Sequence, residues 1–517
     1  MAQLSDLGLP LQRLKAPLPI WHARVDGAAW SSTARALADG GGRLVSMWGT
    51  AREGDARGSA ACAAYAMPDG LVWLELPIGA KTTGFPDLSP LFPCAARMQR
   101  AMADLSGLQA SGAEDTRPWL GHGMWAPGAV PLGADVEPGA ANAGTLPADY
   151  PFVRVQGDGV HEIAVGPVHA GIIEPGHFRF SVVGEKVLRL EAHLGYVHKG
   201  VERRFTELAP LDAYRLAGRV SGDSTVAYAW AYCMALESAW RCEVPLRAAW
   251  LRALMLERER VANHLGDLGA LGNDAALAFG LAQFSRLREN WHRLSKEAFE
   301  HRFMMDAIVP GGVAFDLSLT LRDRLRQQCD DTEREVRALK VVYDEHAGLQ
   351  DRFLTTGRVS PQLAAQLGLT GLAGRASGQA FDLRCDHGWE PYTQFKVVVS
   401  ASDSGDVAAR VAMRFDELFE SLRLIRAICS GLPQDALKAE LWPATTPAHG
   451  AGWVEGWRGE ILVALETGAD GRIVRCHCHD PSWQNWPVLE HAVIGNIVPD
   501  FPLINKSFNL SYSGHDL

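Results

Sequence analysis

A stretch rich in proline, glycine and alanine, residues 126–151 (APGAVPLGADVEPGAANAGTLPADYP), divides the 517-residue chain into two unequal parts. The stretch has neither the helical nor the strand period of apolar residues, so its composition is that of a linker. We therefore expect a small domain over residues 1–130, a linker over 131–159 and a large domain over 160–517. Apolar residues make up 47% of the chain, which is enough to bury a core in each domain.

The two parts differ in the spacing of their apolar residues. The first mixes apolar runs with helical stretches over 31–38 and 95–105, which predicts a small α+β domain. In the second, a strand-rich stretch over 160–190 is followed by long helical patterns, the last of which has Ser402 or Asp403 as its expected N-cap. This order predicts a mainly helical bundle with a small β-sheet, so the fold class is α+β.

The charge balance excludes some classes of partner. The chain has 50 Lys and Arg against 60 Asp and Glu, a net charge of −10, whereas proteins that bind nucleic acid present a basic face. It has no run of about 18 uncharged apolar residues, so we expect no transmembrane helix. The N-terminus carries neither an apolar signal core nor a twin-arginine pattern, and we expect a chain that is not exported.

The nine cysteines form no C-x-x-C pair, so we expect free thiols rather than a disulfide framework. The closest group, Cys476-His477-Cys478-His479, lies in the alternating sequence IVRCHCHD, which predicts a strand. Both cysteines would then face one side and both histidines the other, whereas a tetrahedral metal site needs four converging ligands. We expect an ordinary strand there, and no residue of the chain is expected to ligate a metal.

Seven segments of the second part are individually unusual and occur in a fixed order. They are GPVHAGIIEPGHFRF, LGYVHKGVE, ERERVANHLGDLGAL, VPGGVAFDL, GRASGQAFDLRCD, VEGWRGE and DPSWQNWP. Together they resemble the large subunit of energy-converting, membrane-bound nickel–iron hydrogenases of the formate hydrogenlyase type, and its relative, the 49-kDa subunit of respiratory complex I. The resemblance covers about residues 160–517.

The first part resembles the complex I 30-kDa subunit in the segment FPDLSPLFPCAARMQRAMADLSG. Arg100, Asp104 and Gly107 match that family, while Gln99 and Ala101 stand where it has glutamates. The order of the two parts, 30-kDa-like and then 49-kDa-like, is that of the formate hydrogenlyase large subunit.

The segments that hold the metals in nickel–iron hydrogenases depart from the family. Those enzymes use two C-x-x-C pairs, because soft thiolates bind nickel and bridge it to iron. The matching positions are Ser221 and Ser224 in RVSGDST, and Ser511 and Gly514 in NLSYSG. Hydroxyls stay protonated near neutral pH and are poor ligands for soft metals, so we expect a nickel-free form that neither oxidises nor evolves hydrogen.

Complex I also lacks these thiolates, and the resemblance to it implies quinone as a possible acceptor in the vacated cavity. Its key tyrosine aligns with Gly222, and its headgroup histidine lies nearest to Pro175-Gly176, where His177 could substitute. These departures weaken the quinone interpretation without removing it.

Although the thiolates are absent, polar residues that match the motifs around the family's cavity are present. The candidate catalytic residues are Glu174, His177, Asp223 and Arg458. The carboxylates and the imidazole could relay protons because their pKa values can be tuned, and Arg458 matches the arginine that overhangs the cavity in the hydrogenases that the chain resembles. The candidate cofactor-binding residues are His169, Arg219, Ser221, Ser224 and Ser511, and His193 and His198 also stand in matching motifs. The alternative is that these groups only satisfy one another's hydrogen bonds in a buried polar core.

The resemblance implies a subunit of a membrane-attached, energy-converting oxidoreductase complex on the cytoplasmic side of the inner membrane. Electrons would arrive from a four-iron cluster in a partner small subunit and pass to quinone or another small acceptor. A ferredoxin-like subunit and antiporter-like membrane subunits would be further partners, and this chain itself would bind no cofactor. The alternative is a catalytically inactive scaffold that couples the redox small subunit to the ion-translocating membrane arm.

One geometric expectation separates these two hypotheses. In the family, the segments aligned with residues 218–227 and 508–517 supply all four metal ligands, so we expect them to face each other. Ser221, Ser224 and Ser511 should converge, and Arg458 should neutralise Asp223 or Glu174, because an unpaired buried carboxylate is costly. An open cavity would favour the redox subunit, and a cavity filled by side chains would favour the scaffold.

Overall fold

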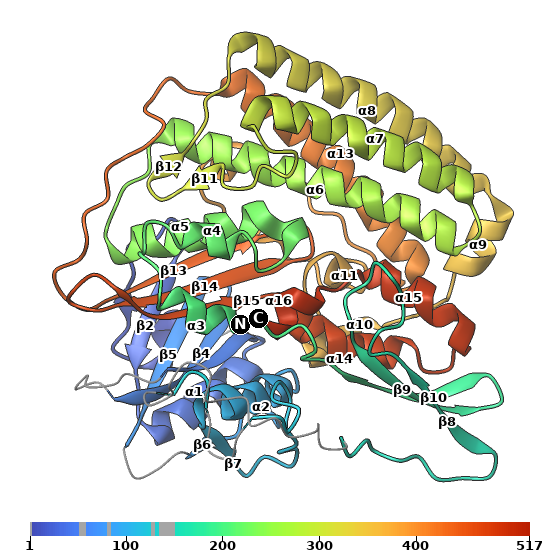
Figure 1. The fold of residues 1–517 in the computed structure, drawn as a ribbon, viewed down its shortest axis with the longest axis horizontal. Helices are drawn as coiled ribbons and strands as arrows, with labels where there is room; N and C mark the ends of the chain where they lie inside the picture. The colour runs from blue at the N-terminus through green and yellow to red at the C-terminus, as the bar shows by residue number, and fades with distance from the viewer. Residues whose placement is uncertain (1–2, 51–57, 80–83, 126–129, 134–149) are drawn as a thin grey trace.

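The computed structural model describes residues 3–50, 58–79, 84–125, 130–133 and 150–517 (Figure 1). A smaller part that mixes strands and helices adjoins a larger, mainly helical part with small sheets, which confirms the expected α+β class. Most of the linker expected over 131–159 lies outside the described residues.

The first part is built on a five-stranded sheet of order β1-β2-β5-β4-β3, in which β2 and β5 are parallel and the other neighbours antiparallel. Two helices pack with it, and a separate two-stranded parallel sheet contacts these helices. The elements are β1 (Gln12–Arg13), β2 (Ile20–Arg24), α1 (Gly27–Asp39), β3 (Arg43–Thr50), β4 (Ser59–Met67), β5 (Gly70–Ile78), β6 (Gly84–Pro86), α2 (Ala95–Ser106) and β7 (Gln109–Ser111).

The residues of α2 that match the 30-kDa family hold the segment that leaves this part. Asp104 accepts hydrogen bonds through one carboxylate oxygen from three successive backbone N–H groups, those of Trp119, Leu120 and Gly121. Arg100 donates to the carbonyls of Arg117 and Pro118. These side chains therefore replace the missing backbone partners of an irregular segment.

The second part begins with a three-stranded sheet, β8 (Val160–Val165), β9 (His177–Val183) and β10 (Lys186–His193). Its bundle consists of four long helices, α6 (Leu246–Asp274), α7 (Ala278–Phe299), α8 (Leu319–Glu345) and α13 (Val407–Gly431). A second sheet contains β13 (Ala448–Glu455), β14 (Glu460–Thr467) and β15 (Ile473–His479). The shorter elements are α3 (Val201–Phe205), α4 (Tyr214–Ala217), α5 (Thr225–Ala239), β11 (Ile308–Val309), β12 (Gly312–Val313), α9 (Ala347–Phe353), α10 (Pro361–Leu367), α11 (Gly371–Arg375), α12 (Leu383–Asp386), α14 (Ser482–Ala492), α15 (Phe501–Phe508) and α16 (Tyr512–Asp516).

Helix α5 lies between the bundle and the second sheet, and all its residues are buried. Its close approach to β13 requires Gly450 and Gly452, because a Cβ atom at these positions would lie 2.0 Å from the carbonyl oxygen of Ala235 and 1.9 Å from that of Ala231. Small residues on both elements thus fix α5, whose N-terminus carries the candidate site.

The N-cap expected for α13 is wrong. The helix begins after Asp406, whose carboxylate accepts the Ala409 N–H at 2.8 Å, not after Ser402 or Asp403. The reason is tertiary, because residues 402–405 hydrogen-bond back to the backbone of α11 and Ala376 instead of starting the helix.

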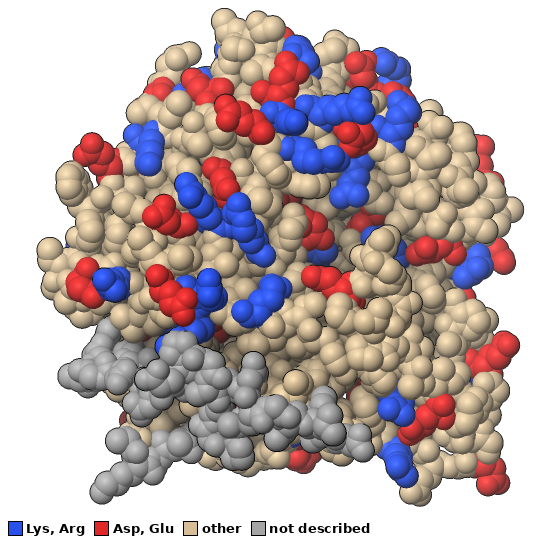
Figure 2. All heavy atoms as spheres, in the orientation of Figure 1, with Lys and Arg blue, Asp and Glu red and all other residues tan. Residues whose placement is uncertain are grey.

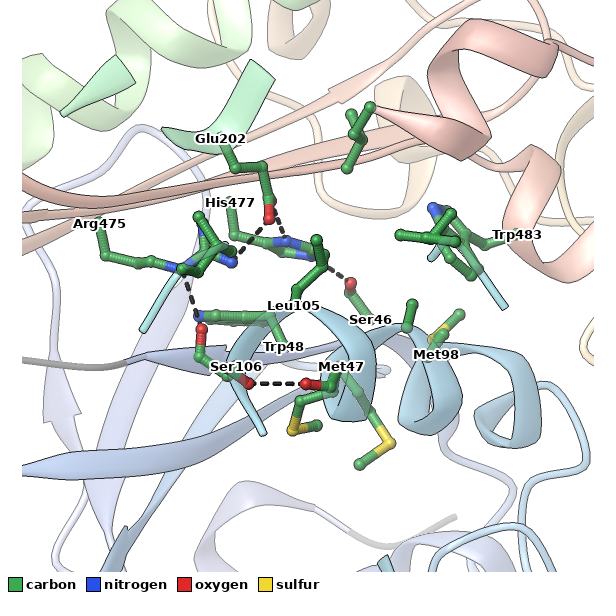
Figure 3. A pocket seen from close by; sticks show the side chains of 16 residues that line it. Ser46, Met47, Trp48, Met98, Leu105, Ser106, Glu202, Arg475, His477 and Trp483 are labelled. Atoms are coloured by element: carbon green, nitrogen blue, oxygen red, sulfur yellow. Dashed lines mark hydrogen bonds and ion pairs between the residues drawn. The ribbon is translucent and has the colours of Figure 1, made fainter. Parts of the chain in front are cut away.

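The strand expected from IVRCHCHD is confirmed as β15, and it joins the two parts of the molecule (Figure 3). The His477 Nδ1 lies 2.6 Å from a carboxylate oxygen of Glu202, and its Nε2 lies 2.7 Å from the hydroxyl of Ser46 on β3. Arg475 donates to the other oxygen of Glu202 at 2.8 Å. The histidine ring also stacks on Trp48, with ring centroids 4.7 Å apart. Both ring nitrogens of His477 are therefore used in a contact between the two parts.

On the face shown in Figure 2, acidic and basic side chains are interspersed rather than gathered by sign. Many of them pair along or between helices, as Arg426 does with Asp330 and Glu333 of α8. Among the described residues, no helix combines the length and the apolar character that are needed to cross a membrane.

Candidate functional site

Two segments far apart in the sequence meet beneath the N-terminus of α5. The segment that precedes α5 contains Ser221, and the segment that precedes α16 contains Ser511. Their hydroxyl oxygens lie 2.9 Å apart, and both residues are buried. The structure thus brings the two serine-bearing segments together, as expected from the resemblance.

The hydroxyls form a chain with one direction. Ser221 donates its single proton to a carboxylate oxygen of Asp223 at 2.9 Å, so the proton between the two serines must come from Ser511. Ser511 in turn accepts the backbone N–H of Gly514 at 2.8 Å and caps α16. Each of these two serine hydroxyls therefore both donates and accepts a hydrogen bond.

The chain ends in an ion pair between Asp223 and Arg458. One guanidinium nitrogen lies 2.8 Å from a carboxylate oxygen of Asp223, and the other contacts the second oxygen. Burial alone would raise the pKa of Asp223, but the charge of Arg458 and the hydrogen bonds from Arg458 and Ser221 lower it below its ordinary value. The first guanidinium nitrogen also lies 3.4 Å from the hydroxyl of Ser224.

The position of Arg458 is set by the residues around it. Its guanidinium lies over the ring of Trp457, 4.0 Å from the ring centroid, and its Nε donates to the carbonyl of Asn509 at 2.5 Å. Arg260, from α6, donates to the carbonyls of Glu455 and Gly456 and so fixes the turn that carries Arg458. The arginine is held in one place before any partner binds.

At Gly514, which the resemblance aligns with the fourth metal ligand of the hydrogenases, a carboxylate lies close to the backbone. A Cβ atom on Gly514 would lie 2.4 Å from a carboxylate oxygen of Asp480 and 2.9 Å from the hydroxyl of Ser511. That same oxygen of Asp480 accepts the hydroxyl of Tyr228 at 2.9 Å. Three hydroxyls and a glycine do not supply the thiolates that nickel and iron require, so the donor set does not fit that group.

The remaining candidate residues lie outside this cluster. Glu174 is exposed and accepts the backbone N–H of Ser513 at 3.0 Å, near the start of α16. His169 and His177 are half-buried and bond through Nδ1 to backbone carbonyls of the segment before β9.

Arg219 lies at the surface, where it forms a bidentate ion pair with Asp306 at 2.7 and 2.8 Å. Arg458 therefore neutralises Asp223 and not Glu174.

His177 instead lines a large cavity of about 980 Å³ between the two parts of the molecule. His193 lies in the same wall, stacked between the rings of Tyr150 and His122, with centroids 3.9 and 4.4 Å away. Burial and the neighbouring His122 and Arg100 lower the pKa of His193 to about 2, so this ring is neutral. His198, from the next loop, bonds to the carbonyl of Asp516 at 2.8 Å.

Sequence reasoning missed a group of buried arginines and carboxylic acids. Arg384 pairs with Glu257 and Asp382, and Arg375 pairs with Glu417 and Glu455, all fully buried. A signal existed in the four successive charged residues of ERERVANH, because a helix that is charged on every face is costly to bury unless its charges are paired. Sequence reasoning also missed Glu259, which accepts two N–H groups in the first turn of α5, those of Val226 and Ala227.

Within the described part of the chain, one group of three residues has metal-ligating atoms close enough to share an ion. His22, Glu75 and His449 place them within 4.8 Å of one another, where β2 and β5 meet β13. Glu75 is bonded to His22 at 3.3 Å, so the group already satisfies part of its own hydrogen bonding.

Comparisons with known proteins show the family to which the chain is similar. Residues 23–141 match the model of the respiratory-chain NADH dehydrogenase 30 Kd subunit, and residues 274–452 match that of the 49 Kd subunit. Formate hydrogenlyase subunit 5 of Escherichia coli is 30% identical, over 86% of this chain and 79% of its own length. The carbon monoxide-induced hydrogenase of Rhodospirillum rubrum is 30% identical, over 68% of this chain and 97% of its own.

An NADH-quinone oxidoreductase subunit of Bacteroides fragilis is 26% identical, over 83% of this chain and 86% of its own. A chain of the membrane-bound sulfane sulfur reductase, an archaeal respiratory membrane complex, shares the fold with a TM-score of 0.65 and 23% identity, over 69% of this chain and 98% of its own. By the identity and coverage of these relatives, the chain belongs to the family of fused complex I 30-kDa and 49-kDa subunit homologues that includes formate hydrogenlyase subunit 5.

Proposed function

We propose that this chain is a nickel-free large subunit that acts as scaffold and coupling element in a membrane-attached redox complex. It would connect an iron–sulfur small subunit and a ferredoxin-like subunit to antiporter-like membrane subunits, on the cytoplasmic side of the membrane. The chain itself would hold no redox cofactor.

One observation carries this proposal, the direct contact between Ser221 and Ser511. Two hydroxyls 2.9 Å apart leave no room between them for a metal ion or an acceptor molecule. The remaining space is taken by the Asp223–Arg458 ion pair, and Asp480 occupies the place of a fourth ligand. A filled cavity of this kind is what the scaffold hypothesis requires.

The ion pair has a definite role in such a subunit. It replaces a charged metal cluster with a charged pair of side chains that ties α5 and the β13–β14 turn to the C-terminal segment. Loss of either partner would leave an unpaired charge where α5, the β13–β14 turn and the C-terminal segment meet. This would weaken the surface that these three segments form.

The test compares assembly with turnover in the purified complex that carries an Asp223→Asn chain. If the pair is structural, the variant lowers the yield of small subunit that co-purifies, while turnover for each assembled complex stays at the wild-type value. The surface variant Asp306→Asn, which breaks the Arg219 pair, serves as the matched control. Full assembly with lost turnover would contradict the scaffold role and would favour chemistry at Asp223.

A second candidate is supported by the cavity that His177 and His193 line. Its volume of about 980 Å³ is at the upper end of the range for small-molecule sites, and Phe152 and Tyr196 add aromatic surface. In this case electrons from the partner cluster would pass to quinone or another small acceptor there. The variant His177→Gln should then raise the KM for a soluble quinone, whereas His161→Gln, on the nearby strand β8, should not. Equal kinetics in both variants would exclude this candidate.

A further inference from the structure

A second cavity lies on the other side of Asp223, between the segment that precedes α5, helices α6 and α7, and the loop that follows α7. Its volume is about 290 Å³. Its polar lining contains two guanidinium groups and an imidazole, and its apolar lining contains aromatic and thioether side chains. The residues that matter here are Arg258, Arg288, His292, Phe303 and Met304.

Arg258 is fully buried, and no ion pair found among the described residues includes it. It donates to the hydroxyl of Ser295, the carbonyl of Trp291 and the side chain of Gln328, all neutral acceptors. Its Nη1 has no partner. Burial lowers the pKa of Arg258 to about 10, so the group is still charged at neutral pH. A buried cation without a counter-charge is costly.

Arg288, one turn before His292 on α7, is half-buried and adds a second charge that forms no ion pair with a described residue. Its guanidinium lies against α6, with Nη1 3.0 Å from where a Cβ atom on Gly266 would sit, so the glycine makes room for it. Its Nε is buried and has no hydrogen-bond partner. The Nε2 of His292 is also without a partner, while its Nδ1 bonds to the carbonyl of Arg302 at 3.0 Å.

The acidic residues of the cavity do not balance these charges. Asp223 is paired with Arg458. Glu259 faces two backbone N–H groups, and burial raises its pKa to about 8, so it is mostly uncharged at pH 7. His292 has its pKa lowered to about 4 by burial and by the nearby Arg288, so it adds no charge in the free protein. The cavity therefore holds a net positive charge that nothing in the described chain neutralises.

From this arrangement of cationic groups without a counter-charge around one cavity, we infer that the cavity is a binding site for a small carboxylate anion. Its two oxygens would accept from Arg258 and Arg288, since a planar guanidinium matches the geometry of a carboxylate. Phe303 and Met304 would contact a short apolar substituent. The volume of about 290 Å³ is near the lower end of the range for small-molecule sites. This inference adds a ligand site to the chain and does not depend on the scaffold function.

The test is titration calorimetry of the purified full chain with sodium acetate at pH 7, with chloride exchanged to keep the ionic strength constant. We expect saturable binding, and about tenfold or greater loss of affinity in Arg288→Gln, because one charge-assisted hydrogen bond is lost. The matched control is Arg286→Gln, an exposed position on the same helix whose partner is Glu335. It should bind acetate as the wild type does.

Several results would overturn the inference. The first is an absence of saturable binding by the wild type, and the second is unchanged binding by Arg288→Gln. Tighter binding of phosphate than of acetate would contradict the carboxylate class. Arg258→Gln should also weaken binding, but because this core variant can fail to fold, Arg288→Gln decides the outcome. None of these results bears on metal content or assembly, so failure here is distinguishable from failure of the scaffold proposal.

Discussion

The hydroxyl oxygens of Ser221 and Ser511 lie 2.9 Å apart, although 290 positions separate the two residues in the sequence. The contact joins the segment before α5 to the segment before α16. The Gly514 N–H donates to Ser511, Ser511 donates to Ser221, and Ser221 donates to Asp223. The contact between the two segments consists of hydrogen bonds and one ion pair, and its strength can be measured by substitution.

Removing the hydroxyl of Ser511 should weaken the contact between the two segments. Ser511→Ala leaves the Gly514 N–H without its acceptor and Ser221 without its donor, so we expect the free energy of unfolding to fall by about 1–2 kcal/mol. Urea denaturation measures this. Ser31→Ala, an exposed hydroxyl that bonds only within its own helix, should change stability by less than about 0.5 kcal/mol. Equal effects of both substitutions would contradict the account.

Breaking the Asp223–Arg458 pair should cost more than breaking a surface pair. We expect Asp223→Asn to destabilise the chain by about 2 kcal/mol, below the full value for a buried pair because 34% of the Asp223 side chain is exposed. Asp306→Asn, which breaks the Arg219 pair, should cost about 0–1 kcal/mol. A double-mutant cycle with Arg458→Gln gives the coupling energy, and a value near zero would mean that the pair contributes no stability.

A side chain at position 514 should not be tolerated. Gly514→Ala places a Cβ atom 2.4 Å from the Asp480 carboxylate, which must then move away from Tyr228, so we expect a loss of about 1–3 kcal/mol. Gly222→Ala, in the same site, meets nothing within 4 Å and should be nearly neutral. Thermal unfolding of the two variants compares them directly. A neutral Gly514→Ala would mean that the fourth position is open.

The contact between the two parts of the molecule should depend on pH. Burial opposes the charge of Glu202, but Arg475 and His477 lower its pKa to about 2. A carboxylate with a lowered pKa stabilises the fold above its ordinary value of 4.5, and this contribution is lost as the pH falls from 4.5 towards 2. The shift corresponds to about 3 kcal/mol.

Glu202→Gln should therefore lower stability at pH 7 and flatten its dependence on pH below 5. Stability measured by urea denaturation at several pH values tests this. The exposed Glu207→Gln, whose only ion-pair partner among the described residues is Arg204, should leave the pH dependence unchanged. An unchanged pH dependence in Glu202→Gln would show that another group causes the acid instability.

Much of the fold followed from local patterns, but parts of the site did not. The alternation of IVRCHCHD predicted β15, because side-chain direction in a strand depends only on position. The same pattern could not show that His477 would be occupied by Glu202 and Ser46, which come from distant segments. The convergence of Ser221 and Ser511 came from the family resemblance, since no local rule brings such distant segments together. Arg219, expected in the site on the same basis, pairs at the surface with Asp306, which no motif marked.

Metal analysis of the intact complex tests the central claim most directly. The complex is purified without chelators from cells grown with added nickel, and nickel is measured by mass spectrometry relative to the amount of this chain. Because hydroxyls and a glycine stand in place of four thiolates, and Ser221 contacts Ser511, we predict nickel far below one atom for each chain. One nickel atom for each chain, lost in an Asp223→Asn or Ser511→Ala variant, would contradict the account.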